Sequence, residues 1–277
     1  MNDKAVKAVL QVKNSAFIRK LIKPYMDNKR KKDMQRYEHS EESARIKELK
    51  NKFEGEDCYI IGNGPSLKIK DLEMLRGKYT FAANRIYTLF DKTNWRPTFY
   101  TCVDPEAYKL FGPELMNMEA EYVFLDVTAK KYVGNEKKEN LYYIYQYSEF
   151  TLNRWDSTNP FINEDVSKFV SLGMTVTFVA MQLAIYMGFK RIYLLGVDHN
   201  YAKQVSRAGV VTEDKSKATY GEGIIDTGIG IQYTDTTTEA YEKAQQYCQT
   251  HDVKIYNATR GGKLEIFPRV SLEDSFL

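Results

Sequence analysis

Short apolar runs rich in β-branched and aromatic residues recur along this chain, with helical segments between most of them. Near-continuous apolar runs of this length are typical of parallel strands that are covered on both faces. Strands that alternate with helices predict an α/β fold with a Rossmann-like, doubly wound and mostly parallel sheet. The expected strands are CYIIG (58–62), YTFAA (79–83), TFYTCV (98–103), YVFL (122–125), RIYLLGV (191–197) and VKIY (253–256).

Helices are expected in the intervals between these strands. The clearest is TVTFVAMQLAIYM, for which Thr175 is a candidate N-cap and Gly188 a candidate C-terminal glycine. In residues 201–235 the periodicity fades while Gly, Thr, Asp and Lys accumulate, which predicts a long polar loop or lid. The expected helices are 68–76, 106–117, 175–187 and 236–250.

Charge is distributed unevenly along the chain. Residues 1–52 hold 15 Lys and Arg against 7 Asp and Glu, whereas the net charge of all 277 residues is only +3. We therefore expect a basic helical N-terminal arm at 1–52, followed by one α/β domain at 53–277.

The arm begins with apolar residues that fall roughly on one helical face and are interrupted by Lys and Arg, which argues against a secretory signal. These apolar residues are Val6, Leu10, Phe17, Leu21 and Ile22. A basic amphipathic helix can bind an anionic membrane surface, here through residues 1–36, and a packing or oligomerisation helix is an equal alternative. The basic stretch at 28–36 is followed by no motif that reads nucleic acid, so no nucleic-acid partner is expected.

The cysteine pattern and the hydropathy of the sequence indicate in which cellular compartment the protein is expected. Cys58, Cys102 and Cys248 are scattered without a CxxC pair, which suits a reducing compartment and argues against a cysteine-based zinc site. The most apolar segment, 178–189, is too short to span a bilayer. The expected location is the cytoplasm, with peripheral binding to the inner face of the membrane left open.

A short polar side chain follows each expected strand. In open α/β sheets, ligands bind outside the carboxyl ends of the strands, so these side chains would surround one crevice. Asn and Asp are also favoured in turns and N-caps, so about half of them are expected to be structural, with the edge residue Asp126 the weakest candidate. The set is Asn63, Asn84, Asp104, Asp126, Asp198 and Asn257.

The sequence GNGPS, which begins at Gly62, ends the first strand and precedes a helix. Glycines such as Gly62 and Gly64 let the backbone approach a ligand, and a helix N-terminus favours an anion. The segment is neither GxGxxG nor a P-loop. Ligand contact and a tight structural turn remain open alternatives.

Two further segments carry candidate site residues. In LLGVDHNY, His199 stands beside an acid at the expected ligand-binding edge and is the candidate general base, with a purely structural role as the alternative. In NATRGG, Arg260 could bind a phosphate, with an ordinary glycine turn and a solvated arginine as the alternative. The accompanying candidates are Asp198, Asn200, Tyr201, Asn257, Thr259 and Gly261.

No cluster of His, Cys and carboxylates has the spacing of metal ligands, so no metal site is expected. Asp104 and Asp198 could nevertheless hold a divalent ion together with phosphates.

Three segments, in this order, resemble a known family: GNGPSL, FVAMQLAIYMGFKRIYLLGVDHNY and NATRGGKLEIF. They resemble a bacterial family related to the 6-hydroxymethylpterin diphosphokinase-like proteins, whose members often occur in surface-polysaccharide synthesis. The same elements resemble the bacterial sialyltransferases that use CMP-sialic acid, and flagellin-modifying glycosyltransferases share a related domain. The resemblance covers about residues 55–270.

This resemblance implies a donor-binding site. By position, Asn63, Gly64 and Ser66 would hold the donor phosphate and neighbouring groups, and Gly196 and Asp198 would cradle the ribose and base. The other implied donor contacts are Asn84, Asp104, Thr175, Thr177 and the loop 257–262.

The catalytic histidine of the sialyltransferases has no counterpart in this chain. It would stand near 233–235, where this sequence has Tyr-Thr-Asp, so either Asp235 or His199 would act as the base. Two family tyrosines that assist the leaving phosphate are matched only loosely, by Tyr201 and Tyr220.

The expected function is an inverting, metal-independent glycosyltransferase that needs no cofactor beyond its nucleotide-sugar co-substrate. The favoured donor is a CMP-activated nonulosonic acid, and the expected acceptor is a glycan or lipid-linked glycan of the cell surface. One alternative is a Mg²⁺-dependent diphosphokinase that acts on a pterin-like alcohol with ATP, and another is a non-catalytic nucleotide-binding scaffold. Homo-oligomerisation is left open.

Overall fold

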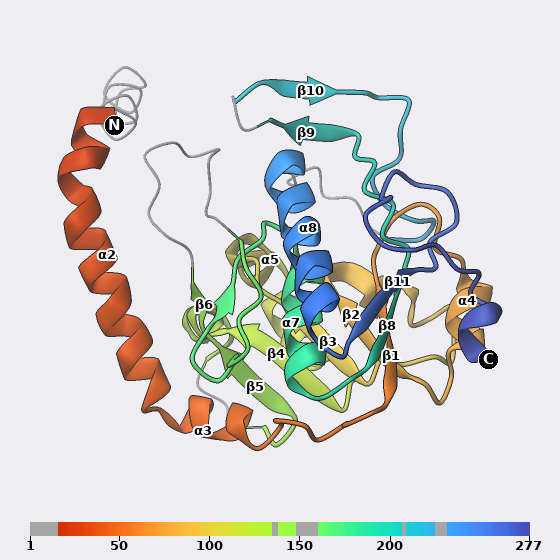
Figure 1. Cartoon of the computed structure of the whole chain (residues 1–277), viewed down its shortest axis with the longest axis horizontal. Helices are drawn as coiled ribbons and strands as arrows, with labels where there is room; N and C mark the ends of the chain where they lie inside the picture. Colours follow the sequence, from red (N-terminus) through yellow and green to blue (C-terminus); the bar gives the residue numbers. More distant parts are fainter. Residues whose placement is uncertain (1–15, 135–137, 148–159, 207–208, 225–231) are drawn as a thin grey trace.

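The computed structural model describes residues 16–134, 138–147, 160–206, 209–224 and 232–277. Its centre is a seven-stranded sheet in the order β11-β8-β1-β2-β3-β4-β5, with helices on both faces (Figure 1). Every neighbouring pair in this sheet is parallel, so the predicted Rossmann-like fold class is confirmed. The strands are β1 (Asp57–Ile61), β2 (Tyr79–Ala83), β3 (Phe99–Cys102), β4 (Tyr122–Asp126), β5 (Leu141–Ile144), β8 (Arg191–Leu195) and β11 (Lys254–Asn257).

Each predicted strand is found, and β5 is the strand of this sheet that the sequence did not predict. The α-helices are α2 (Ala16–Glu38), α3 (Glu41–Lys47), α4 (Ile69–Met74), α5 (Pro105–Met116), α6 (Lys130–Val133), α7 (Val176–Tyr186) and α8 (Thr234–Thr250). The short 3₁₀ helices are η1 (Asn84–Leu89), η2 (Val127–Ala129) and η3 (Asp274–Phe276). The small paired strands are β6 (Gln146–Tyr147), β7 (Val170–Ser171), β9 (Lys203–Val205) and β10 (Val211–Glu213).

The segment expected to be a long polar loop is partly ordered as a hairpin. β9 and β10 pair antiparallel within it, so the prediction of a loop throughout 201–235 is wrong for these strands. Residues 207–208 and 225–231 of the same segment lie outside the described residues.

The strands separate two apolar layers because successive side chains of a strand point to opposite faces of a sheet. In β1, Cys58 and Ile60 belong to the layer that includes α7, whereas Tyr59 and Ile61 belong to the layer that includes α4 and α5. The ring of Phe81 stacks on that of Phe99 in the first layer, with 4.3 Å between centroids.

α7 is apolar on almost every side and is buried against the sheet. Its single strongly polar interior residue, Gln182, is satisfied: Oε1 accepts from the Ser171 N–H at 2.9 Å, and Nε2 donates to the Ser171 carbonyl at 3.0 Å. A buried amide without partners would destabilise the fold, so these bonds also fix the position of α7 relative to β7. Thr175 is the N-cap, as predicted, and accepts from the Thr177 N–H.

The second half of the predicted arm packs into the domain. Ile46 and Leu49 are almost fully buried, and the Tyr37 hydroxyl donates to the Tyr143 carbonyl at 2.9 Å. A domain boundary at residue 52 therefore cuts through the core. Residues 1–15, which carry much of the predicted membrane-binding face, lie outside the described residues, so the proposed membrane contact stays a prediction.

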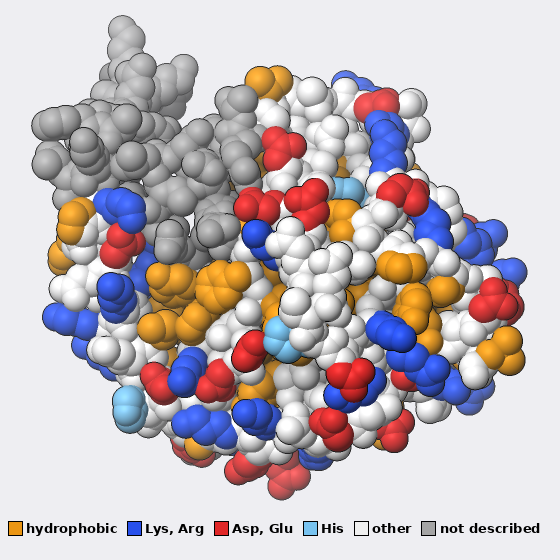
Figure 2. Space-filling view, viewed as in Figure 1, with side chains coloured by type: hydrophobic (Ala, Val, Ile, Leu, Met, Phe, Trp, Pro, Cys, Tyr) orange, Lys and Arg blue, Asp and Glu red, His pale blue; other side chains and the backbone are white. Residues whose placement is uncertain are grey.

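Two surface properties bear on the partners. Among the described helices, none combines the length and apolarity needed to cross a bilayer. On the face shown in Figure 2, the described Lys and Arg side chains are interspersed with Asp and Glu and form no continuous basic patch.

The packing of α3 predicts that Ile46→Ala lowers the free energy of unfolding by about 2–5 kcal/mol, the usual cost of emptying a buried Ile site. Urea unfolding measures this change. Lys47→Ala, on the exposed face of the same helix, is the matched control and should change stability by less than about 0.5 kcal/mol. Equal effects of the two substitutions would show that residues 41–47 are not part of the core.

Candidate functional site

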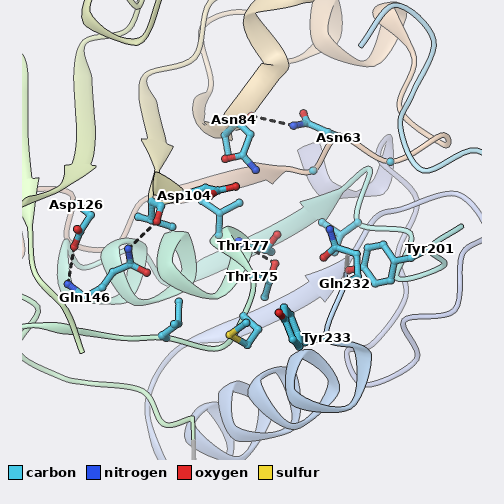
Figure 3. A pocket seen from close by; sticks show the side chains of 18 of the residues that line it. Asn63, Asn84, Asp104, Asp126, Gln146, Thr175, Thr177, Tyr201, Gln232 and Tyr233 are labelled. Carbon is cyan, nitrogen blue, oxygen red and sulfur yellow. Dashed lines mark hydrogen bonds between the residues drawn. The ribbon is translucent and has the colours of Figure 1, made fainter. Parts of the chain in front are cut away.

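A cleft of about 810 Å³ lies at the carboxyl ends of the parallel strands. Figure 3 shows side chains from several strand ends and from the start of α7 around one space. This is the position that parallel α/β sheets use for ligands. The predicted site residues that line the cleft are Gly62, Asn63, Gly64, Asn84, Asp104, Thr175, Thr177, Gly196, Asp198, His199, Asn200 and Tyr201.

The ends of β1 and β8 touch closely at the floor of the cleft. A Cβ atom at Gly62 would clash with the Gly196 carbonyl oxygen, and one at Gly64 would clash with the Asp198 carboxylate. Gly196 also has a φ of +68°, in the left-handed region that favours glycine. The glycines therefore allow the two loops to approach each other.

Two N–H groups of the GNGPS turn are paired within the fold. Gly62 donates to the Leu195 carbonyl at 2.7 Å, and Gly64 donates to the Gly196 carbonyl at 2.9 Å. Ser66 turns away from the cleft, and its hydroxyl donates to Asp198 Oδ2 at 2.7 Å. The N–H groups of Gly62 and Gly64 therefore serve the fold in this structure, and the expected contact of the turn with a donor phosphate stays a prediction.

The carboxylate of Asp198 lies next to the GNGPS turn. Burial raises the pKa of Asp198, while the hydrogen bonds from Ser66 oppose that shift. A carboxylate here disfavours a phosphate directly at the turn, because like charges repel.

Two asparagine side chains present unfilled acceptors at the cleft. The Asn63 amide nitrogen donates to the Ala83 carbonyl at 3.0 Å, which orients the amide and leaves Oδ1 buried without a partner in the described structure. Asn84 Oδ1 is in the same situation, at a residue with a left-handed φ of +53°. A buried acceptor without a partner costs about 1–3 kcal/mol, so ligand N–H or O–H groups would be bound favourably here.

The N-terminus of α7 opens into the cleft between these amides and α8. Thr175 and Thr177 both lie on the lining, and Met174 before them has a φ of +56°. The positive end of the helix dipole favours an anion at this position.

His199 also lines the cleft, next to α8. Its Nε2 is 2.8 Å from Thr238 Oγ1, and its ring makes edge contacts with Tyr201 and Tyr241. Nδ1 is buried and has no partner among the described residues. Burial lowers the pKa of His199 below its usual 6.5, so the ring is neutral at pH 7.

The predicted site residues of the C-terminal loop form hydrogen bonds and an ion pair within the fold. Asn257 Nδ2 donates to the Leu264 carbonyl, Thr259 Oγ1 accepts from the Val197 N–H at 3.1 Å, and Arg260 forms a bidentate ion pair with the fully buried Asp71. These bonds use the groups that had been expected to bind the donor. Neither these three residues nor Gly261 lines the cleft.

Asp235, the other candidate base, stands in the first turn of α8, is exposed and does not line the cleft. Asp126 does line it, but its carboxylate accepts from the N–H groups of Thr128 and Gln146 at 2.9 and 3.0 Å. Asp104 is exposed and caps α5 by accepting from the Glu106 N–H. Of the six Asn and Asp residues at the strand ends, Asp104, Asp126 and Asn257 thus have structural roles, in line with the expectation for about half of them.

Sequence reasoning missed one end of the cleft. Arg30 and Asp33 of α2 line it together with Tyr145 and Gln146, which follow the unpredicted strand β5. The Tyr145 hydroxyl donates to the Arg30 carbonyl at 3.4 Å, and burial raises the pKa of Tyr145 to about 12. No sequence motif marks these residues. The one sequence signal that concerned α2 was the basic character of the N-terminal arm.

Within the described part of the chain, no group of three or more His, Cys, Asp or Glu side chains could hold a metal ion. Under the diphosphokinase alternative, a Mg²⁺ ion would rely on Asp104 or Asp198 with substrate phosphates, and Asp198 is already engaged by Ser66.

The fold is that of a Rossmann-like α/β protein with its cleft at the switch between β1 and β8. The chain belongs to the 6-hydroxymethylpterin diphosphokinase MptE-like family, whose model matches residues 32–204. The family relationship predicted from the sequence is thereby confirmed.

Several solved structures with a similar course of the chain are described as glycosyltransferases or sialyltransferases. The Maf glycosyltransferase from Magnetospirillum magneticum AMB-1 is 14% identical with a TM-score of 0.46, over 87% of this chain and 38% of its own. The sialyltransferase CstII from Campylobacter jejuni, in complex with CMP-3FNeuAc, is 14% identical with a TM-score of 0.43, over 78% and 86% of the two chains.

The monofunctional alpha-2,3-sialyltransferase Cst-I from Campylobacter jejuni is 15% identical with a TM-score of 0.42, over 78% and 80% of the two chains. No curated protein sequence matches the chain.

The contact between β1 and β8 predicts that Gly62→Ala destabilises the protein by about 1–3 kcal/mol, the usual cost of overpacking. Thermal unfolding measures this loss. Gly112→Ala is the matched control, because a Cβ there meets only ordinary contacts at 3.6 Å or more within a helix. If Gly62→Ala were as stable as Gly112→Ala, the close approach of the two loops would not need glycine.

Proposed function

We propose that this protein is a glycosyltransferase that moves a sugar from a nucleotide-activated donor to a glycan acceptor. The favoured donor is a CMP-activated nonulosonic acid, and the reaction is an inverting displacement that needs no metal. The observation that carries the proposal is that one cleft is lined by His199, a neutral imidazole whose Nδ1 has no partner among the described residues, and by Asn63 and Asn84, whose amide oxygens also have none.

Each part of the cleft has a role in this proposal. The two amide oxygens accept from hydroxyl or amino groups of the nucleoside. The phosphate lies at the N-terminus of α7, where the helix dipole stabilises the charge that grows as the nucleotide leaves. We favour this position over the GNGPS turn, because the N–H groups of Gly62 and Gly64 are paired within the fold.

His199 acts as the base in the proposed reaction. Nδ1 takes the proton of the acceptor hydroxyl as that oxygen attacks the anomeric carbon and the bond to the donor phosphate breaks. A neutral ring is required for this step, and burial keeps it neutral at pH 7. Asp235 is not favoured because it is exposed outside the cleft.

The acceptor enters at the end of the cleft next to α2. Arg30 and Asp33 line this end, together with Tyr145 and Gln146. Charged and amide groups of this kind suit a hydroxyl-rich glycan. Closure of the segment that follows β8 would exclude water and limit donor hydrolysis.

A second candidate function follows from the family description, which refers to a diphosphokinase. Such a reaction moves pyrophosphate from ATP and depends on Mg²⁺ between carboxylates and phosphates. Activity that survives EDTA favours glycosyl transfer, whereas strict dependence on Mg²⁺ favours the kinase. A protein that binds nucleotide but turns over no donor would be a scaffold.

A thermal-shift screen with CMP, CDP, UDP, GDP and ATP tests the donor class. We expect CMP to raise the melting temperature, because a ligand that binds only the folded state stabilises it. Asn84→Ala should abolish much of the shift, and Asn94→Ala, at an exposed position, should leave it intact. A shift with ATP alone would contradict the proposed donor.

His199→Gln should reduce CMP release from a CMP-sugar donor by roughly 10²–10⁴-fold, the usual contribution of a general base. The wild-type rate should fall as the pH drops below 6.5, through the lowered pKa of His199, because protonation removes the base. His39→Gln, at an exposed histidine, is the control. A full rate in His199→Gln, or a rate that does not change with pH in this window, would exclude His199 as the base.

A further inference from the structure

The hydroxyl group of Thr238 lies between two hydrogen-bonding partners, the imidazole of His199 and the backbone of Thr234. Thr238 Oγ1 lies 2.8 Å from His199 Nε2 and 2.8 Å from the Thr234 carbonyl oxygen, one turn earlier in α8. A hydroxyl has one hydrogen to donate, and the two neighbours compete for it.

The carbonyl oxygen decides this competition because it can only accept. Without a hydrogen between them, Thr238 Oγ1 and the Thr234 oxygen would face each other at 2.8 Å with lone pairs only, which is repulsive. The hydroxyl hydrogen therefore points to Thr234. The bond between Thr238 and His199 must then be donated by the imidazole, so that Nε2 carries the hydrogen and Nδ1 is bare.

We propose that Thr238 is a positioning residue that holds His199 in the Nε2–H tautomer and so presents Nδ1 as the basic nitrogen of the cleft. Nδ1 is buried and meets neither a donor nor an acceptor among the described residues, so no other hydrogen bond opposes this assignment.

Burial is the cause of the lowered pKa of His199, and no charged side chain among the described residues adds to that shift. The titratable groups in ring contact with it are Tyr201 and Tyr241, both of which burial keeps protonated by raising their pKa values. Asp198, the preceding residue, accepts from Ser66 and not from the imidazole. The backbone of His199 has a φ of +51°, so the residue is held in an unusual conformation that aims the ring at α8.

The assignment of the tautomer does not depend on the proposed function. The catalytic role of Nδ1 does rest on the proposed function. Two measurements on the whole chain test the tautomer and the catalytic role separately. The first is the ¹⁵N NMR spectrum of the imidazole rings at pH 7.5, in which a bare and a hydrogen-bearing nitrogen have well-separated shifts. The chain has only three histidines, so His199→Gln assigns the signals, and His39 and His251 serve as internal references.

The wild-type spectrum should show His199 with the hydrogen on Nε2. Thr238→Val keeps the branched shape but removes the acceptor, and should shift His199 alone toward the other tautomer. Thr238→Ser restores the hydroxyl and should restore the wild-type signals. A wild-type ring with its hydrogen on Nδ1, or an unchanged tautomer in Thr238→Val, would overturn the proposal; the wild-type measurement decides even if the valine variant does not fold.

The second readout is CMP release from a CMP-sugar donor. Thr238→Val should lower the rate about tenfold, with rescue by Thr238→Ser, because only part of the ring population then presents a bare Nδ1. A changed tautomer with an unchanged rate would overturn the catalytic role of Nδ1. A wild-type protein that shows the expected tautomer but turns over no donor would instead overturn the proposed function.

Discussion

The close approach of β1 and β8 is the constraint on which the rest of the site depends. Hydrogen bonds from Gly62 and Gly64 to the end of β8 draw the two strand ends together, and a side chain at either glycine would prevent it. Because β8 leads directly into Asp198 and His199, this contact places the candidate base in the same cleft as Asn63. Thr259, which follows β11, also holds the end of β8, because its hydroxyl accepts from the Val197 N–H.

The polar residues at the strand ends divide into two groups with different physical roles. Asp126 and Asn257 use their side-chain groups in hydrogen bonds that shape the turns, and Asp198 is held by Ser66. Asn63 and Asn84 instead keep buried oxygens without partners. Buried acceptors are normally satisfied, so the unfilled ones are the better guide to where a ligand binds.

Much of the fold could be predicted from sequence because its signals are local. The apolar runs that form β1, β2, β3, β4, β8 and β11 are continuous, and Thr175 is an ordinary N-cap before the most apolar helix. β5 was missed, and with it the neighbouring Tyr145 and Gln146. The role of α2 was also out of reach, since the contact between Arg30 and Tyr145 joins residues 115 positions apart.

The sequence by itself determined the class of fold and the edge of the sheet where a ligand would bind, because strand and helix periodicities and the Asn or Asp after each strand are properties of neighbouring residues. Only the tertiary structure decided which of those polar groups are already paired within the fold. Arg260 is paired with Asp71, the N–H groups of Gly62 and Gly64 are paired with the end of β8 and the residue after it, and the state of His199 depends on Thr238. Hydrogen-bond partners that lie far apart in the chain settle these assignments, since a donor or acceptor already paired within the fold is not available to a substrate.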